Sequence, residues 1–459
     1  MSLTYEAVLA ALRDRGRFGI RLGLGRTRAL LRELGDPQDA VRGALVGGTN
    51  GKGSVLALVG SVLRAAGLRA GETPKPHLVT YRERLQIGGR LVDPGTFARL
   101  VEATLPAADR VARRHGDPTE FELLTAVAFR WFADEGVDLA LVEVGLGGRL
   151  DATHAWDGGV AAITNVDLDH MDRLGATVTA IAREKAAIIE RGDLAVTGAS
   201  GDGLTVIRRR AGRMGTPLRI VQPAPLLGWD RDGIVVQLPG LGETRVGLRG
   251  RHQAANVAVA DAILDALDQA GIATVTPAAR RRGYGQARWA GRLELVEIRD
   301  PATGAPGQPR EVLLDGAHNP AGAAVLGQAL EDLRPYLAGG SEHRPPAITL
   351  IIGAMADKDV AGVIGALAGS AALVGGQVIC TEIDEARALP ATDLAALWTT
   401  IAGSASRARV VKPPSAALAE ALATAPGPIV VAGSLYLVGA LRAILVDDPA
   451  LRDVAGSAP

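Results

Sequence analysis

V-G-G-T-N-G-K-G-S, at residues 46–54, lies between a short apolar run at 44–46 and a helical pattern over 55–66. Strand, glycine-rich loop and helix in this order form an anion cradle, because loop N–H groups and the positive helix end face the same point. Lys52 adds a charge for phosphate oxygens, and the Ser54 hydroxyl is a natural Mg²⁺ ligand. The spacing departs from G-x-x-x-x-G-K-[ST], since Gly53 separates Lys52 from Ser54. The stretch predicts a variant phosphate-binding loop, with a plain glycine-rich turn as the alternative.

Composition limits the classes of partner. The chain has 459 residues, of which 47% are hydrophobic, so two or three domains with large cores are expected. Lys+Arg and Asp+Glu balance at 50 each and aromatics are only 3%, which argues against a nucleic-acid partner. A single cysteine, Cys380, fits a reducing compartment and reads as a buried thiol. With neither a signal peptide nor a charge-free apolar run, we expect a cytoplasmic protein with no membrane partner. A monomer is also expected.

Polar side chains follow two apolar runs that read as strands. Glu143 ends the run at 137–144, and Asp169 and His170 follow the run at 160–166. Ligands bind at the carboxyl ends of strands in open α/β sheets, and a buried carboxylate is costly unless it is paired or binds a metal. Glu143 is therefore a candidate Mg²⁺ ligand, with an ordinary strand-end residue as the alternative. The residues G-L-G-G-R-L-D at 145–151 give only a weak dinucleotide fingerprint, because Leu150 fills the last glycine position.

Two other charged segments have open interpretations. Two prolines keep residues 71–84 extended, and this loop carries His77 and Arg84, which could bind an anionic substrate or face solvent. Lys185 lies in a predicted helix over 178–190. Near a metal it could lose its proton and be modified, but the sequence alone favours a solvent-exposed lysine.

The pattern divides the chain near residues 287–292. Beyond that linker, strands and helices alternate from 312 to 445, and the first strand ends in D-G-A-H-N-P at 315–320. The Pro/Gly-rich stretch 300–310 reads as a hairpin insert. The expected fold is α/β, with a P-loop-type doubly wound ATPase domain at 1–290 and a smaller Rossmann-like α/β domain at 291–459.

Ten segments taken together resemble folylpolyglutamate synthase/dihydrofolate synthase, a family of the Mur ligase superfamily. In chain order they are G-T-N-G-K-G-S (48–54), P-H-L-x-x-x-x-E-R (76–84), F-E-L-L-T-A-V-A-F (121–129), V-E-V-G-L-G-G-R-L-D-A-T (142–153), I-T-N-V-D-L-D-H (163–170), I-A-R-E-K-A-A-I-I (181–189), G-R-H-Q-A-A-N (250–256), W-A-G-R-L-E (289–294), D-G-A-H-N-P (315–320) and G-S-L-Y-L-V-G (433–439). They span most of the chain in the family's order.

The resemblance implies a ligase that uses MgATP to join L-glutamate to a folate or to dihydropteroate through an acyl phosphate. It implies ATP contacts from Gly48, Thr49, Asn50, Gly51, Lys52, Gly53, Ser54, Asn256, Arg292, Asp315 and His318. It implies two Mg²⁺ ions, one on Ser54 and Glu143 and one on His170 and Lys185, with Lys185 carbamylated. Lys52, His170 and Lys185 would be catalytic, and His77, Arg84 and Asp151 would contact the folate.

Three positions depart from the family pattern. His154 follows D-A-T where the family has asparagine. Pro74-Lys75 precedes Pro76, whereas the family pattern is S-P-H-L. Ala290 stands in W-A-G-R, whereas the family pattern is W-P-G-R. The first two departures lie on the expected folate side. Two alternatives stay open, namely a related Mur-type amino-acid ligase for another carboxylate and a non-catalytic ATP-binding module.

Overall fold

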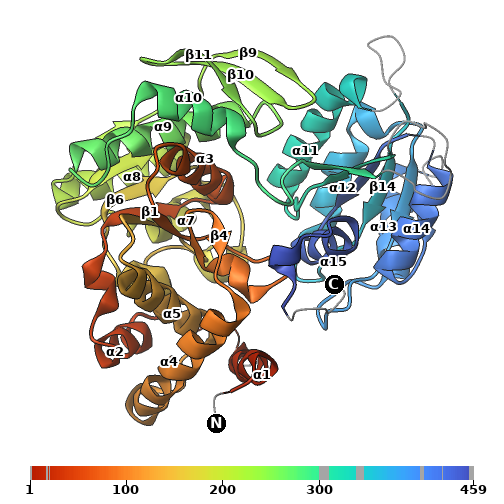
Figure 1. Ribbon diagram of the computed structural model, residues 1–459. Coiled ribbons are helices and arrows are strands. Elements are labelled where there is room, and N and C mark those ends of the chain that lie inside the picture. The colour runs from red at the N-terminus through yellow and green to blue at the C-terminus, as the bar shows by residue number, and fades with distance from the viewer. Residues whose placement is uncertain are drawn as a thin grey trace.

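The computed structural model describes residues 3–16, 19, 21–298, 310–337, 346–403, 408–425 and 427–453. The described chain forms two lobes side by side (Figure 1). The N-terminal lobe holds an eight-stranded and a three-stranded sheet, and the C-terminal lobe holds a six-stranded sheet. The expected α/β class, with parallel sheets in both lobes, is confirmed.

The eight-stranded sheet has the order β4-β3-β2-β5-β1-β6-β7-β8. Its strands pair in parallel from β2 to β8, whereas the two-residue strands β3 and β4 add antiparallel pairs, β3 with β2 and β4 with β3. The central strands read as unbroken apolar runs because helices bury both of their faces. The strands are β1 (Gly43–Gly47), β2 (Ala70–Thr73), β3 (Gln86–Ile87), β4 (Arg90–Leu91), β5 (Leu139–Glu143), β6 (Gly159–Ile163), β7 (Leu194–Thr197) and β8 (Leu218–Ile220).

Helices cover both faces of this sheet. One face packs against α3 (Lys52–Ala65), α9 (Gln253–Gln269) and α10 (Pro277–Gln286). The other face packs against α4 (Pro94–His115), α5 (Glu120–Glu135), α7 (Val178–Ala186) and α8 (Gly201–Met214), with α1 (Tyr5–Gly16) and α2 (Gly25–Glu33) beside them. Thr119 and Glu122 form a capping box that fixes the start of α5. The strand and the helix predicted on either side of the glycine-rich loop correspond to β1 and α3.

The three-stranded antiparallel sheet was only partly expected. The sequence indicated β10 (Gly233–Leu238) but neither β9 (Leu226–Asp230) nor β11 (Gly242–Val246). Residues of β9 are half-buried or exposed, so the strand lacks a marked apolar pattern. Helix α8 was also missed, because its three glycines and its run of arginines obscure the helical pattern.

The six-stranded sheet has the order β12-β13-β17-β14-β15-β16, and only the edge strand β12 is antiparallel. Its strands are β12 (Glu294–Ile298), β13 (Arg310–Leu314), β14 (Thr349–Ile352), β15 (Gln377–Cys380), β16 (Ala408–Val410) and β17 (Ile429–Ala432). Helices α11 (Pro320–Leu333), α12 (Val360–Ala368) and α13 (Ala391–Ala402) pack on one face, and α14 (Pro414–Thr424) and α15 (Leu435–Leu445) pack on the other. Cys380 is buried as expected. Of the hairpin predicted at 300–310, only Arg310 belongs to the residues that the structure describes.

Short helices complete the described chain. They are α6 (Met171–Leu174), η1 (Pro37–Ala40), η2 (Tyr81–Arg84), η3 (Ala152–Ala155), η4 (Arg334–Tyr336), η5 (Ala371–Leu373) and η6 (Pro449–Leu451). Across the described ranges, every helix is too short or too polar to cross a membrane.

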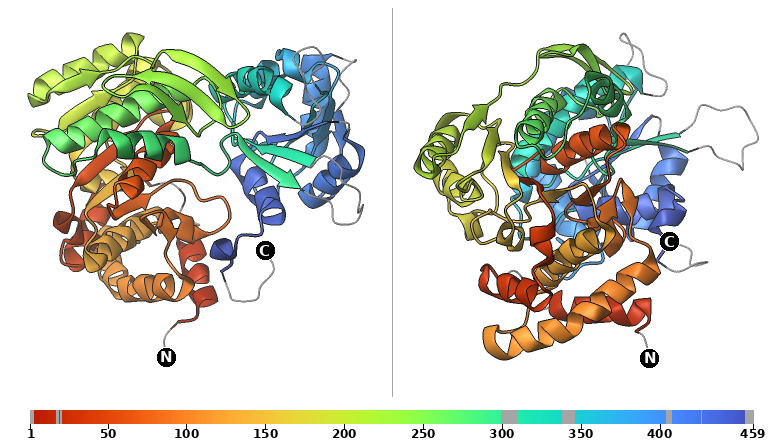
Figure 2. Two further views of the ribbon diagram at one scale, coloured as in Figure 1. Left: turned by 45° about the horizontal axis from the view of Figure 1, so that its top comes forward. Right: turned by 60° about the vertical axis from the view of Figure 1, so that its left-hand side comes forward.

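The end of the described chain ties the two lobes together. After α15 the chain passes to η6 and reaches the N-terminal lobe near α1 (Figure 2). There the buried Arg82 guanidinium donates to the carbonyls of Ala450 (2.8 Å) and Arg452 (2.9 Å) and pairs with Asp453. On another side, Arg251 of the N-terminal lobe pairs with Asp332 of α11 at 2.7 Å. Arg82 therefore holds the two lobes together.

Candidate active site

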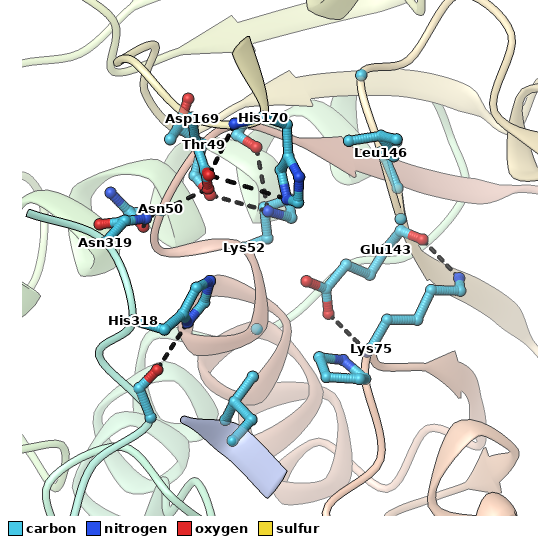
Figure 3. A pocket seen from close by; sticks show the side chains of 18 of the residues that line it. Thr49, Asn50, Lys52, Lys75, Glu143, Leu146, Asp169, His170, His318 and Asn319 are labelled. Carbon is cyan, nitrogen blue, oxygen red and sulfur yellow. Dashed lines mark hydrogen bonds and ion pairs between the residues drawn. The ribbon is translucent and has the colours of Figure 1, made fainter. Parts of the chain in front are cut away.

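One large cavity of about 1010 Å³ opens between the two lobes in the part of the chain that the structure describes. Its N-terminal wall comes from the loops after β1, β2, β5 and β6, and its C-terminal wall from the loop after β13 and from α11. Figure 3 shows side chains from both lobes converging on this space. The cavity therefore lies at the carboxyl ends of parallel strands in both sheets, where open α/β sheets bind ligands.

The glycine-rich loop has a fixed shape. Gly51 precedes α3 with a φ of +81°, and a Cβ at this position would lie 2.3 Å from Asn256 Oδ1. The Asn50 N–H donates to Asn165 Oδ1 (2.9 Å), and the Thr164 hydroxyl donates to the Asn50 carbonyl (2.6 Å). Hydrogen bonds to the chain after β6 thus hold the loop around the start of α3, where an anion binds.

Two lysines converge on one carbonyl of this loop. Lys52 Nζ donates to the carbonyls of Gly48 (3.1 Å) and Thr49 (2.9 Å), and Lys185 Nζ donates to the same Gly48 carbonyl at 2.9 Å. Lys185 is only 5% exposed, so the solvent-exposed position favoured by the sequence is wrong. Burial and the charge of Lys52 lower the pKa of Lys185 to about 7. Burial also lowers the pKa of Lys52, although the charge of Glu143 opposes that shift.

Glu143 presents a buried carboxylate at the end of β5. Its side chain lines the cavity with Ser54 of the first turn of α3, and its Oε2 accepts the Lys75 N–H at 2.9 Å. Burial raises the pKa of Glu143, and the positive charge of Lys52 acts against this shift. A carboxylate and a hydroxyl are the hard oxygen donors that suit Mg²⁺, and a bound cation would offset the cost of the buried charge. The residues present therefore fit a magnesium ion.

The loop after β6 supplies the opposite edge of the site. His170 has a left-handed backbone (φ +49°), and its N–H donates to Asp169 Oδ1 at 2.8 Å. Burial lowers the pKa of the His170 imidazole, and the charge of Asp169 acts against this shift. A neutral imidazole can accept a proton or bind a metal through a ring nitrogen. Asp169 also contacts Lys358 (3.6 Å) and Asn319 Nδ2 (3.2 Å). No group of three or more His, Cys, Asp or Glu that could hold a metal occurs among the described residues, so the expected ligand pairs would need further oxygen ligands.

The C-terminal wall brings in the residues expected from D-G-A-H-N-P. Asp315 accepts the N–H groups of Leu293 and Ala317, both at 2.9 Å, and burial raises the pKa of its carboxyl. His318 Nδ1 lies 2.8 Å from the Gly316 carbonyl, and burial lowers its pKa to about 4. Both residues line the cavity together with Arg292 and Asn256.

Not all of the residues expected to contact the folate line the cavity. Asp151 and Arg84 line the cavity, but His77 does not. His77 accepts a hydrogen bond from Arg84 Nε at 2.8 Å and packs on Tyr81, with ring centroids 4.4 Å apart. His77 therefore supports Arg84 in this structure, and its expected contact with the folate stays a prediction.

The sequence interpretation missed several residues of the cavity. Lys75 and Phe121 line it from the N-terminal lobe, and Asn319 and Arg387 line it from the C-terminal lobe. The sequence marked Lys75 only as a departure from the family pattern, although it lies beside Pro76 in a loop already expected at the site. Arg387 lies in a loop between β15 and α13, and no sequence motif marks it.

Comparison with known proteins gives consistent results over the whole chain. Residues 46–211 match the Mur ligase middle domain, and residues 300–444 match the dihydrofolate synthetase C-terminal domain. The dihydrofolate synthase/folylpolyglutamate synthase of Bacillus subtilis is 34% identical over 72% of this chain and 77% of its own.

Solved structures agree. Mycobacterium tuberculosis folylpolyglutamate synthase complexed with ADP superposes with a TM-score of 0.83 and 31% identity, covering 97% of this chain and 100% of its own. A bifunctional folylpolyglutamate synthase/dihydrofolate synthase with Mn, AMPPNP and L-glutamate bound gives a TM-score of 0.78 and 27% identity, covering 97% and 100%.

The loop geometry predicts the effect of Gly51→Ala. The new Cβ would collide with Asn256, and alanine would have to adopt the positive φ of Gly51. We therefore expect ATP binding, measured by calorimetry, to weaken at least tenfold. The protein should also lose about 1–3 kcal/mol of unfolding free energy. Gly67→Ala is the matched control, because Gly67 has a φ of +82° with nothing within 4 Å of its Cβ. The control should lose stability but bind ATP normally. Equal ATP affinity in both variants would contradict the role of the loop.

Proposed function

The chain belongs to the folylpolyglutamate synthase/dihydrofolate synthase family, and on this premise we propose that it is an ATP-dependent ligase that adds L-glutamate to folates. We also propose that it accepts 7,8-dihydropteroate. The observation that carries the proposal is the cavity itself, in which a phosphate-binding loop, a buried carboxylate and a second lobe meet. The acid, ATP and the amine have to meet in one water-poor space for this reaction.

The first step activates the acid. A carboxylate is a poor acylating agent, so its oxygen attacks the γ-phosphorus of ATP, and ADP leaves as an acyl phosphate forms. This step brings anionic groups together, and catalysis rests on positioning and on positive charge. Lys52 and the loop N–H groups would bind the β- and γ-phosphates, and Asn256, Arg292, Asp315 and His318 would contact the rest of the nucleotide.

The second step forms the amide. The glutamate amine attacks the acyl carbon, a tetrahedral intermediate collapses, and inorganic phosphate leaves. Glutamate would enter from the C-terminal wall, which Arg387 lines. Arg387 pairs with Asp357 at 2.9 Å, and its guanidinium would also bind a glutamate carboxylate. The proton that the amine loses would pass to the departing phosphate, and His170 would act in this step as a ligand of the second Mg²⁺.

Two Mg²⁺ ions complete the proposal. Ser54 and Glu143 would hold the first, and His170 and Lys185 the second. Magnesium supplies charge neutralisation at the phosphate oxygens. We propose that Lys185 is carbamylated, because two ammonium groups on the Gly48 carbonyl repel each other and favour a neutral amine at one of them. A neutral amine attacks CO₂ and loses a proton, and the resulting carbamate is an anionic oxygen ligand.

We propose that residues 1–290 form the ATP-binding domain with its folate-binding loops and that residues 291–459 form the C-terminal glutamate-ligase domain. The gap between α10 and β12, where the chain passes from one sheet to the other, supports this boundary. The cytoplasmic location and the monomeric state expected from the sequence stay predictions.

The proposed role of Lys52 predicts the kinetics of Lys52→Ala. Loss of this charge from the phosphates should lower kcat about a hundredfold or more, as removing one electrostatic donor does. Lys412→Ala is the control, because Lys412 lies on the surface and pairs with Glu382. ATP-dependent glutamate incorporation measures both variants, and near-normal turnover of Lys52→Ala would refute the assignment.

The acceptor is tested by a glutamate-incorporation assay. We expect glutamate-dependent phosphate release with tetrahydrofolate and with 7,8-dihydropteroate, and none with UDP-sugar peptides. Turnover of the peptides alone would favour a related Mur-type amino-acid ligase. ATP binding without phosphate release on any acid would favour the non-catalytic module.

Carbamylation is tested with ¹³C-bicarbonate. We expect a carbamate carbon signal in wild-type protein and none in Lys185→Ala, together with loss of activity in the variant and partial recovery on addition of a short carboxylic acid. Activity of the wild type should fall as the pH drops below about 7, since protonated Lys185 cannot react with CO₂. A spectrum without the signal in fully active protein would count against the modification.

A further inference from the structure

Lysine is rare in this chain and concentrated at the cavity. Of the 50 Lys+Arg residues only five are lysines, at positions 52, 75, 185, 358 and 412. Three of the five line the cavity, and a fourth, Lys358, lies 3.6 Å from Asp169. A chain that otherwise uses arginine keeps lysine where a compact ammonium is needed. Lys52 and Lys185 have roles in the proposed reaction, whereas Lys75 has none so far.

The Lys75 side chain extends toward the Glu143 carbonyl, away from Lys52 (Figure 3). Its Nζ donates to the Glu143 carbonyl at 2.5 Å and to Thr73 Oγ1 at 3.2 Å. A third contact, with the Thr73 carbonyl, is 3.4 Å long and therefore weak. Since an ammonium has three N–H donors, the third can turn to a ligand while the first two fix the side chain.

The neighbours of Lys75 complement this donor. Its Nζ lies 5.3 Å from the centroid of the Phe121 ring, which also lines the cavity. A Cβ on Gly145 would lie 2.8 Å from the Phe121 ring and 3.2 Å from Asp151 Oδ2, so the ring and this carboxylate lie beside each other. Asp151 Oδ2 accepts one N–H, that of Leu146 at 2.8 Å, and a carboxylate oxygen has room for a second. A donor, an acceptor and an aromatic ring therefore share this wall.

We propose that Lys75 is a specificity-determining residue for the acid substrate, donating a hydrogen bond to the ring carbonyl of the pteridine while Asp151 accepts from its N–H groups. A flat heterocycle with both kinds of edge fits a wall with a donor, an acceptor and a ring. The inference rests on the proposed function. In the family pattern S-P-H-L a serine precedes the proline, so this chain puts a longer cationic donor where a short hydroxyl is expected.

The test compares Lys75→Met with wild type on 7,8-dihydropteroate and on its 4-amino analogue, in which an amino group replaces the ring carbonyl. Wild type should prefer the carbonyl compound. Lys75→Met should raise the KM for dihydropteroate on the order of tenfold, the loss of one charged hydrogen bond, and should lose most of the preference. The KM values for MgATP and glutamate should stay within about twofold.

Two further variants make the result specific. Lys75→Gln keeps an uncharged N–H donor and should recover part of the preference for the carbonyl compound. This variant also tests the proposal if Lys75→Met fails to fold. Lys412→Met removes an exposed lysine outside the cavity and should change none of the constants.

Three outcomes would overturn the inference. One is an unchanged KM for dihydropteroate in folded Lys75→Met, and another is an unchanged preference over the 4-amino compound. The third is an equal rise in the KM for MgATP, because that would mean that Lys75 acts through Glu143. Wild-type protein that turns over no folate and binds no dihydropteroate by calorimetry would instead overturn the proposed function.

Discussion

The buried charge at the glycine-rich loop is the constraint on which the site depends. Lys52 and Lys185 donate to one carbonyl, that of Gly48, and Glu143 lines the same cavity. Each buried ion costs several kcal/mol unless opposite charge lies beside it. A nucleoside triphosphate would supply negative charge beside the two lysines, and divalent cations would supply positive charge beside Glu143. The site should therefore gain free energy when such a ligand binds.

The packing of two lobes makes this concentration of charge possible. Each lobe places the carboxyl ends of its parallel strands at the cavity, and neither wall is complete alone. Two arginines hold the lobes in position: Arg82 binds the end of the described chain, and Arg251 pairs with Asp332. Asn319 of the C-terminal lobe reaches Asp169 of the N-terminal lobe inside the cavity. The two walls are thereby positioned to exclude water from a phosphorylated acid, which water would otherwise hydrolyse.

Much of the fold was predictable from the sequence, since strands buried on both faces give unbroken apolar runs and the glycine-rich loop fixes where α3 begins. The sheet β9–β11 was not, because half-exposed strands lack that pattern. At the site, motifs located Lys52, Glu143 and Asp315. The burial of Lys185 depends on α7 packing against the loop after β1, which local sequence does not encode. Spacing cannot tell a ligand contact from a residue that supports one, so the hydrogen bond between His77 and Arg84 was not predictable, and a folate contact of His77 stays a prediction.

The central claim is that ATP and two divalent cations gather between the lobes around the glycine-rich loop. Anomalous diffraction from a crystal with Mn²⁺ and a non-hydrolysable ATP analogue tests it most directly. The account predicts two manganese peaks, one between Ser54 and Glu143 and one between His170 and Lys185, with the triphosphate along residues 48–54. Manganese elsewhere, or a triphosphate bound away from Lys52, would contradict it.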